Sequence, residues 1–451
     1  MLDKKAAFDI LGSALAAIEN DMAEAVLESE RLSLTRFAES GISDNIDTEE
    51  KTLYLRIARD NKIGVIATGD ISPEGIRQAV ENCQAMLGFM MPDDNFESFA
   101  APDEAVLEEN FLVAGTTSFG PRKRAEAIDL ASKIAGKGGF ETSGAFRIES
   151  SSLAVANTLG IRRFFHGNHA SFSLTVSGEK DNSGWAMEFN RDAAAIDINR
   201  LARTATMKAA RSREPIALPD GQYTVILEPA AVGQLLLLLS FLGFGCKTLH
   251  QRRSFMAGQI GEKIAGDNFT VSADPHDPDF NFRPFDYEGV PRRSVELITD
   301  GIARGVVYNT YYANLMKTSS TGHALPPTNN FGPYPKTLSV APGKRSLERI
   351  IETTEKGILI THFWYLNYLN PMRTMVTGTT QDGTFLIENG NITSAVKNMR
   401  TNQSILEAFS GIEAVSADRI IYPQFGVLMK VPGMKIGNFN LITEEDDDSK
   451  C

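Results

Sequence analysis

Cysteine is scarce in this sequence: Cys83, Cys246 and Cys451 are its three cysteines among 451 residues. They are odd in number and far apart, so they give no sign of a disulfide framework. Such usage is typical of a reducing compartment. We therefore expect a cytoplasmic protein.

Runs of positive charge are also missing. The chain has 45 Lys and Arg residues against 57 Asp and Glu residues, a net charge of -12, and its cations are scattered. Binding to a nucleic-acid backbone needs clustered cations. The charge pattern therefore argues against direct nucleic-acid binding.

No apolar run is long enough to cross a membrane. The most apolar segment, AAVGQLLLLLSFLGFG at Ala230–Gly245, is shorter than the roughly 20 residues that a spanning helix needs. The first twenty residues place acidic side chains on both sides of a short apolar stretch, unlike a signal peptide. We expect no membrane contact and interpret 230–245 as a buried helix.

Helices segregated from runs of strands predict an α+β fold of mixed helices and largely antiparallel sheets. An N-terminal α/β domain would precede a strand-rich C-terminal domain. The expected divisions are an α+β segment at 1–101, a middle α+β segment at 102–215 packed with the first, and a C-terminal domain at 216–451. From about residue 444 the chain ends in the acidic run EEDDDSKC, which we expect to be solvated.

Local signals place individual elements. Alternating apolar residues at 53–58 predict a half-buried strand, followed by a turn at 60–62 and a second strand. Ser72 and Pro73 predict a helix start. A helix is expected at 346–356, with Ser346 as its cap, and two strands are expected at 160–169 and 170–177.

Two dipeptides in the C-terminal half are typical of hairpin turns. They are Asp382-Gly383 and Asn389-Gly390, with a strand expected at Thr384–Glu388 between them.

Several stretches, in a consistent order, resemble the TldD/PmbA family. The most specific is FDYEGVP at Phe285–Pro291, followed by NTYYA at Asn309–Ala313 and STGHA at Ser320–Ala324. The other similar stretches are 34–45, 55–72, 156–165, 221–236, 252–264, 347–360 and 382–392. The resemblance covers most of the chain apart from roughly the first thirty residues and the acidic tail.

The resemblance implies a cytosolic, dimeric peptidase system. In its catalytic branch, TldD, a helix carries His-Glu-x-x-x-His: the two histidines bind zinc and the glutamate acts as general base on the metal-bound water. A cysteine nearer the C-terminus completes the metal site. Imidazole and thiolate are zinc ligands, and the metal lowers the pKa of its bound water toward neutrality. The PmbA (TldE) branch pairs with TldD and lacks this set.

The zinc set is missing from the corresponding part of this chain. If Gly233 matches the glycine before the family motif, the ligand and base positions fall on Leu237, Leu238 and Leu242. The segment 229–245 contains no His, Asp or Glu in any register, and no cysteine lies near 419–427. We therefore expect no catalytic residue, metal ligand or cofactor in this chain, and expect zinc in a TldD-type partner.

The histidines offer candidates for other roles. His323 and His362 lie in family-like stretches and are candidates for a peptide-binding groove, with a structural role as the alternative. His166 and His169 are expected on opposite faces of a strand. His276 lies among three aspartates, for which a solvated loop is favoured over a hard-cation site.

Three functions remain open at this point. The preferred hypothesis is a non-catalytic, PmbA/TldE-like subunit that acts on unfolded peptides with a TldD-type zinc partner. The second is an autonomous metallopeptidase whose metal site has moved to His323 or His362. The third is a regulatory binding protein without proteolysis, because the family is also linked to DNA gyrase and toxin–antitoxin modulation. The sequence does not decide between homodimer and heterodimer.

Overall fold

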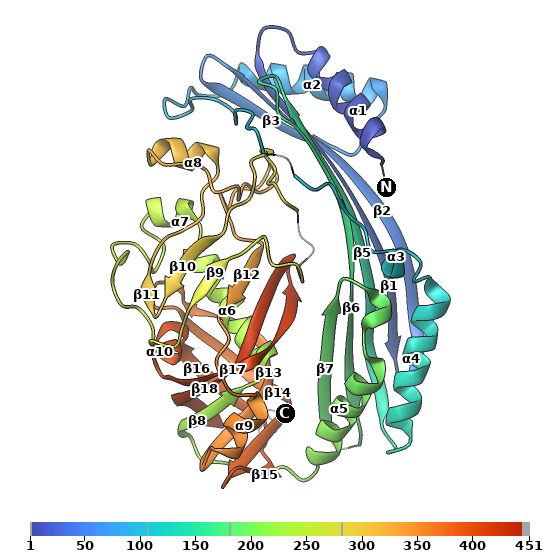
Figure 1. The fold of residues 1–451 in the computed structure, drawn as a ribbon, viewed down its shortest axis with the longest axis vertical. Helices are drawn as coiled ribbons and strands as arrows, with labels where there is room; N and C mark the ends of the chain where they lie inside the picture. Colours follow the sequence, from blue (N-terminus) through green and yellow to red (C-terminus); the bar gives the residue numbers. More distant parts are fainter. Residues whose placement is uncertain (1, 106, 180–181, 281–282, 444–451) are drawn as a thin grey trace, which may run out of the picture.

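The computed structural model describes residues 2–105, 107–179, 182–280 and 283–443. The expected acidic tail and Cys451 lie outside the described residues. The fold is α+β, with mixed helices and largely antiparallel sheets, and the C-terminal half is rich in strands, as predicted. Figure 1 shows a long curved sheet standing beside a second body built from the C-terminal half.

The N-terminal half contains seven strands and six helical segments in its described residues. The strands are β1 (Met22–Ala38), β2 (Gly41–Arg59), β3 (Lys62–Thr68), β4 (Asn110–Phe111), β5 (Glu141–Asn157), β6 (Arg162–Ser177) and β7 (Ser183–Asn190). The helices are α1 (Lys4–Ala16), α2 (Pro73–Leu87), α3 (Ala114–Thr117), α4 (Pro121–Gly136), the 3-10 helix η1 (Ala193–Ala195) and α5 (Ile198–Arg211).

The C-terminal half contains the remaining described elements. Its strands are β8 (Gly221–Leu227), β9 (Val271–Ala273), β10 (Val295–Thr299), β11 (Ile302–Ala303), β12 (Thr337–Val340), β13 (Lys356–Asn370), β14 (Met375–Glu388), β15 (Asn391–Ala395), β16 (Met399–Ser404), β17 (Ile412–Gln424) and β18 (Val427–Thr443). Its helices are α6 (Pro229–Gly243), α7 (Cys246–His250), α8 (Thr310–Leu315), α9 (Leu347–Glu352), the 3-10 helix η2 (Pro371–Arg373) and α10 (Ile405–Ser410).

The first sheet runs in the order β3-β2-β1-β5-β6-β4, with β7 also paired to β6. Its pairs are antiparallel except β4 with β6. Helices α1 and α2 pack against one end of this sheet, while α4 and α5 pack against the other (Figure 1). Each helix pair covers its own apolar core, because the strands are too long for one pair to cover. The sheet joins strands from both predicted N-terminal segments, whose division at 101 stays a prediction.

The local signals around β2 and β3 behave as predicted. Leu53, Leu55 and Ile57 are fully buried on one face. Asp60 and Asn61 take φ values of 52° and 60°, the left-handed pair that a tight hairpin turn requires. At the start of α2, the Ser72 side chain accepts a hydrogen bond from the Gly75 amide, and Pro73 occupies the first turn.

The second sheet closes on itself. Its order is β11-β10-β9-β12-β18-β16-β14-β13-β8, and β8 also pairs with β18. The strands β18, β16, β14, β13 and β8 therefore form a ring of pairings. Its apolar core contains most of α6, so the helix is buried, as its composition predicts.

Three sequence interpretations need correction. The dipeptide Asp382-Gly383 does not form a hairpin turn. It lies inside β14, opposite the point between Ile360 and His362 at which the pairing with β13 shifts register. Residues 162–177 form one strand, β6, rather than two. The helix expected at 346–356 ends at Glu352, because the chain enters β13 at Lys356.

Asn389-Gly390 does form the turn between β14 and β15, as predicted. No helix in the described part of the chain combines the length and the apolar character needed to cross a bilayer.

Candidate functional site

Helix α6 holds the positions at which the family resemblance implies zinc ligands and a base. Leu237 is 2% exposed, while Leu238 and Leu242 are half-buried. Most of the other side chains of the helix are buried hydrocarbon. Zinc is held by imidazole, thiolate or carboxylate groups, and α6 offers none of them. The residues present do not fit a zinc ion at this helix.

The helix is locked to its surroundings by its few polar and small residues. The Gln234 carboxamide donates to the Phe363 carbonyl and accepts from the Phe363 amide, each at 2.8 Å. A Cβ on Gly233 would lie 2.7 Å from the Tyr422 ring, so glycine allows the close approach to β17. These contacts identify α6 as a packing element.

Aromatic residues surround the half-buried side of α6. Tyr368 donates a hydrogen bond to the Leu238 carbonyl at 2.6 Å. Phe241 stacks on Tyr334, with ring centroids 5.1 Å apart, and also contacts Phe331. Phe331 is 57% exposed. This side of the helix therefore lies close to an apolar part of the surface.

Further exposed apolar side chains lie at the end of β13 and in η2. Four large side chains at 364–372 are 55–78% exposed: Trp364, Tyr365, Leu369 and Met372. We call this stretch the apolar hairpin, because it leads directly into β14. Clustered exposed hydrocarbon of this kind marks interaction surfaces in soluble proteins.

His323 is fully buried. Its Nδ1 lies 2.8 Å from the Thr321 carbonyl, which assigns the proton to Nδ1, and its Nε2 has no hydrogen-bond partner among the described residues. Burial, followed by the nearby Arg292 charge, holds the pKa of His323 well below its usual range. The imidazole is therefore neutral.

His362 pairs with Asp382 at the junction of the two halves. Its Nε2 lies 2.8 Å from Asp382 Oδ2, and its ring packs on Trp185 of β7 at 4.9 Å. Although burial opposes it, the hydrogen bond from His362 helps to lower the pKa of Asp382. Neither His362 nor His323 lines either of the two cavities described below, and their groove role stays a prediction.

The aspartates around His276 bind a cation of the protein itself. The Lys430 ammonium lies 2.8 Å from Asp277 and 2.7 Å from Asp279. In the described residues, no group of three or more His, Cys, Asp or Glu side chains is arranged to hold a metal ion. Cys246 is buried, which raises its pKa to about 11 and leaves it a poor thiolate donor.

The FDYEGVP motif forms a tight loop around Asp286. One carboxylate oxygen of Asp286 accepts from the amides of Glu288 and Val290, and the other accepts from the amide of Ala324. Two motifs far apart in sequence, FDYEGVP and STGHA, therefore meet at one carboxyl group. Burial raises the pKa of Asp286 to about 7.

The same loop contacts the first sheet through buried charges. Arg56 of β2 lies 2.7 Å from Glu24 of β1 and 3.4 Å from Glu288 of the loop. Glu24 and Glu288 are almost fully buried. Burial raises the pKa of Glu24 to about 7, because desolvation outweighs the ion pair with Arg56. Beside them, the Glu28 carboxylate pairs with Arg283 and accepts a hydrogen bond from the Tyr287 hydroxyl.

A cavity of about 290 Å³, here called the interdomain cavity, opens above Arg56 and Glu288. Its lining also includes Lys247 and, from both halves, a set of aromatic and amide residues: Phe96, Phe99, Tyr311, Tyr312, Asn309, Asn329 and Asn330. Its size and its mixed aromatic and polar lining suit a single side chain of a bound peptide. Tyr311 and Tyr312 belong to the NTYYA motif.

Sequence reasoning missed Arg56, Glu24 and the segment Phe96–Phe99 as parts of a site. The alternation at 53–58 predicts that Arg56 lies on the polar side of a half-buried strand, and the polar, proline-containing stretch 90–115 predicts a linker. Phe96 and Phe99 are nevertheless buried. The available signal was two phenylalanines in an otherwise polar stretch, which a solvated linker does not need.

Comparison with known proteins places these features in a family. Residues 220–443 match the family model described as the PmbA/TldA metallopeptidase C-terminal domain. A metalloprotease PmbA homolog from Haemophilus influenzae is 23% identical over 395 residues, which cover 83% of each chain.

Solved structures share the whole fold. The crystal structure of TldE from Thermococcus kodakarensis superposes with a TM-score of 0.87, at 23% identity, over 97% of this chain and 99% of that one. A Thermotoga maritima protein, described as a candidate modulator of a DNA gyrase, gives a TM-score of 0.84 at 17% identity, over 96% and 99% of the two chains.

Proposed function

The chain belongs to the PmbA/TldD family, and on that premise we propose that it is a non-catalytic, PmbA/TldE-like subunit of a cytosolic metallopeptidase system. It would act with a TldD-type, zinc-bearing partner to process or degrade unfolded peptides. The observation that carries the proposal is α6, in which leucines occupy the positions implied for the ligands and the base. The chain would contribute binding surface and stability, and the partner would contribute the chemistry.

Two surfaces support a subunit role. The apolar hairpin exposes hydrocarbon that a partner subunit would cover, since its side chains lie in a single stretch of chain. The interdomain cavity supplies a mixed aromatic and polar lining for a side chain of an unfolded peptide. We propose the zinc-bearing paralogue as the occupant of the first surface and the peptide as the ligand of the second.

The proposal is tested by comparing the chain alone with the chain plus the zinc-bearing paralogue from the same genome. We expect chelator-sensitive cleavage of a labelled unfolded peptide from the pair, and neither cleavage nor stoichiometric zinc from the chain alone. Robust, chelator-sensitive cleavage by the purified chain would support the relocated metal site and overturn the proposal.

The proposed interface has its own variants. Trp364→Ser combined with Met372→Ser should weaken association with the paralogue at least tenfold, because both side chains are more than 60% exposed and apolar. Phe89→Ser, which also removes an exposed apolar side chain but in the N-terminal half, is the control. Equal weakening by both variants would argue against the hairpin as the interface.

The regulatory hypothesis is favoured by the description of the Thermotoga maritima relative. With a net charge of -12, any effect on gyrase would run through protein contacts rather than DNA. A pull-down from the native cell separates the two: recovery of a paralogue with His-Glu-x-x-x-His supports the subunit role, and recovery of gyrase alone supports regulation.

A further inference from the structure

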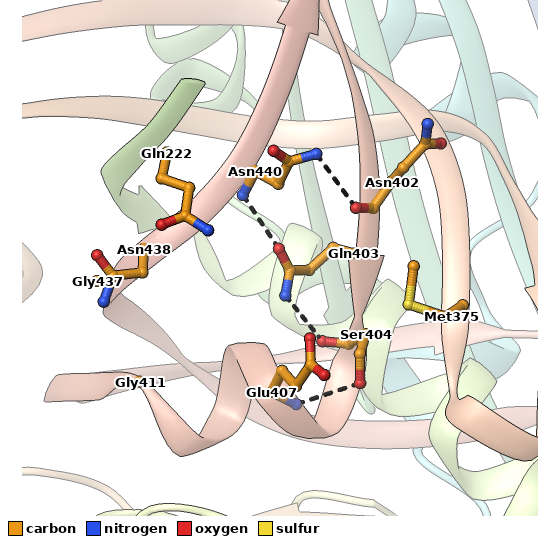
Figure 2. Close-up of a pocket in the computed structure, with 10 residues that line it drawn as sticks. All are labelled: Gln222, Met375, Asn402, Gln403, Ser404, Glu407, Gly411, Gly437, Asn438 and Asn440. Atoms are coloured by element: carbon orange, nitrogen blue, oxygen red, sulfur yellow. Dashed lines mark hydrogen bonds between the residues drawn. The ribbon is translucent and has the colours of Figure 1, made fainter. Parts of the chain in front are cut away.

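A second cavity, of about 530 Å³, opens in the C-terminal half where β16 faces β18 (Figure 2). We call it the seam cavity. Its polar lining consists mainly of uncharged amide side chains with one carboxylate: Gln222, Asn402, Gln403, Asn438, Asn440 and Glu407. None of its lining residues belongs to α6, and it shares none with the interdomain cavity.

The cavity exists because the strand ring is incomplete at this point. Within the described residues, β16 and β18 pair at two positions, Met399 with Thr443 and Arg400 with Ile442. Beyond them the strands separate. By contrast, β16 keeps pairing with β14 as far as Ser404 on its other side.

Side chains replace the missing backbone pairs. The Gln403 carboxamide accepts from the Asn440 amide at 3.0 Å, and the Asn440 carboxamide donates to the Asn402 carbonyl at 3.3 Å (Figure 2). Thr401 Oγ1 donates to the Asn440 carbonyl at 2.9 Å. The seam therefore already recognises extended main chain through carboxamide and hydroxyl groups.

Other polar groups of the cavity are not used in this way. The side chains of Gln222, Asn402 and Asn438 and the carboxylate of Glu407 make no hydrogen bond to any described residue. Each carboxamide offers both a donor and an acceptor, and the carboxylate offers acceptors alone. The carboxamides can therefore pair with the N–H and C=O groups of a peptide main chain, and the carboxylate can pair with one positive charge.

We infer that the seam cavity binds a short extended peptide segment that carries a positive charge, with the charge beside Glu407. The lining contains no Lys, Arg or His to compensate an anion. It also contains no aromatic ring on which the apolar face of a sugar could stack. Carboxamides that already pair with main-chain groups favour a peptide over a sugar, which becomes an outcome of the test.

This inference rests on the proposed function only in the choice of a peptide as ligand. The test uses the full chain without its paralogue, whereas the proposed function is tested by cleavage in the pair. If the chain supports cleavage by the paralogue but does not bind the test peptide, peptide binding in the seam cavity is refuted and the subunit role is not. Peptide binding without any effect on the paralogue would refute the subunit role alone.

The experiment is a peptide-observed NMR titration of the full chain with two probes. One is the capped peptide Gly-Ser-Lys-Gly-Ser, and the other has norleucine in place of lysine. We expect the lysine peptide to bind about two- to fivefold more tightly, the range for a partly exposed ion pair, with the difference shrinking as salt is raised. Maltotriose serves as the sugar probe.

The variant Glu407→Gln should abolish the preference for lysine while leaving the norleucine peptide unaffected. The matched control is Glu348→Gln, because Glu348 is also an exposed glutamate in the first turn of a six-residue, serine-capped helix. Asn438→Gly should weaken both peptides, and glycine tolerates the φ of 56° at this position.

Several results would overturn the inference. They are a lysine preference that survives Glu407→Gln, an equal loss with Glu348→Gln, and binding of maltotriose in place of either peptide. If Asn438→Gly bound the norleucine peptide as tightly as the unmodified chain does, the proposed contact between the Asn438 carboxamide and the peptide main chain would be wrong.

Discussion

Single residues in α6 show how closely this helix is packed. Gly233 lies where the helix crosses the Tyr422 ring, and the Gln234 carboxamide forms two hydrogen bonds with the Phe363 main chain. The leucines of α6 fill the space around the helix with hydrocarbon.

The prediction at this scale concerns two helical glycines. Gly233→Ala should lower the free energy of unfolding by about 1–3 kcal/mol, because the new Cβ would lie 2.7 Å from the Tyr422 ring. Gly12→Ala in α1 is the control: its Cβ meets nothing within 4 Å, and alanine should stabilise by about 0.5–1 kcal/mol. Denaturant titration measures both. A stabilised Gly233→Ala protein would contradict the close packing.

Strand β14 is shaped by contacts that only a neighbouring strand supplies. In β14, Asp382 and Gly383 have positive φ values of 55° and 127°, and the local register shift turns Asp382 toward His362. An Asp-Gly pair favours such a conformation in a hairpin turn or in a bulge alike. Continued pairing of β14 with β13 on both sides of the dipeptide selects the bulge.

Truncating a buried leucine of α6 should destabilise the fold more than truncating a half-buried one. Leu237→Ala should destabilise by about 2–5 kcal/mol, because Leu237 is 2% exposed and a cavity would remain. Leu242→Ala should cost less than half as much, because this half-buried side chain loses less contact. Thermal and denaturant unfolding measure both. Equal losses would place the two leucines in equivalent surroundings, contrary to the structure.

At the scale of the whole molecule, the two halves are joined by buried charges. Glu24 and Arg56 come from the first sheet, and Glu288 comes from the FDYEGVP loop of the second body. The motif is therefore a docking element between the halves, with the interdomain cavity above it. Ionisation within this network should affect the stability of the entire fold.

This network predicts a pH dependence. The folded state raises the pKa of Glu24 from 4.5 to about 7, so it binds the proton more tightly than the unfolded chain does. The corresponding stabilisation is complete below the unfolded pKa and is lost as the pH rises through about 7, by about 3 kcal/mol in total. Glu24→Gln should flatten this decline in denaturant titrations between pH 5 and 8. Glu50→Gln, at an exposed position of β2, should leave it unchanged.

Much of the local structure was predictable because its causes lie within a few residues. Ser72 caps α2 through the Gly75 amide, three residues away, and Asp60-Asn61 turns the chain by its own backbone preference. The alternation of Leu53, Leu55 and Ile57 predicts their common buried face. The interpretation of Asp382-Gly383 failed because its conformation depends on β13, more than ten residues away along the chain.

The sequence by itself determined that α6 carries no side chain of the kinds that bind zinc. That conclusion depends on composition alone, since no register supplies a ligand between 229 and 245. Only the tertiary structure decided which charges meet. Arg56 and Glu288 are separated by 232 residues, and their contact depends on how two sheets pack, which no local preference encodes. For the same reason, the seam cavity could not be predicted: it exists where two strands of a closed ring fail to pair.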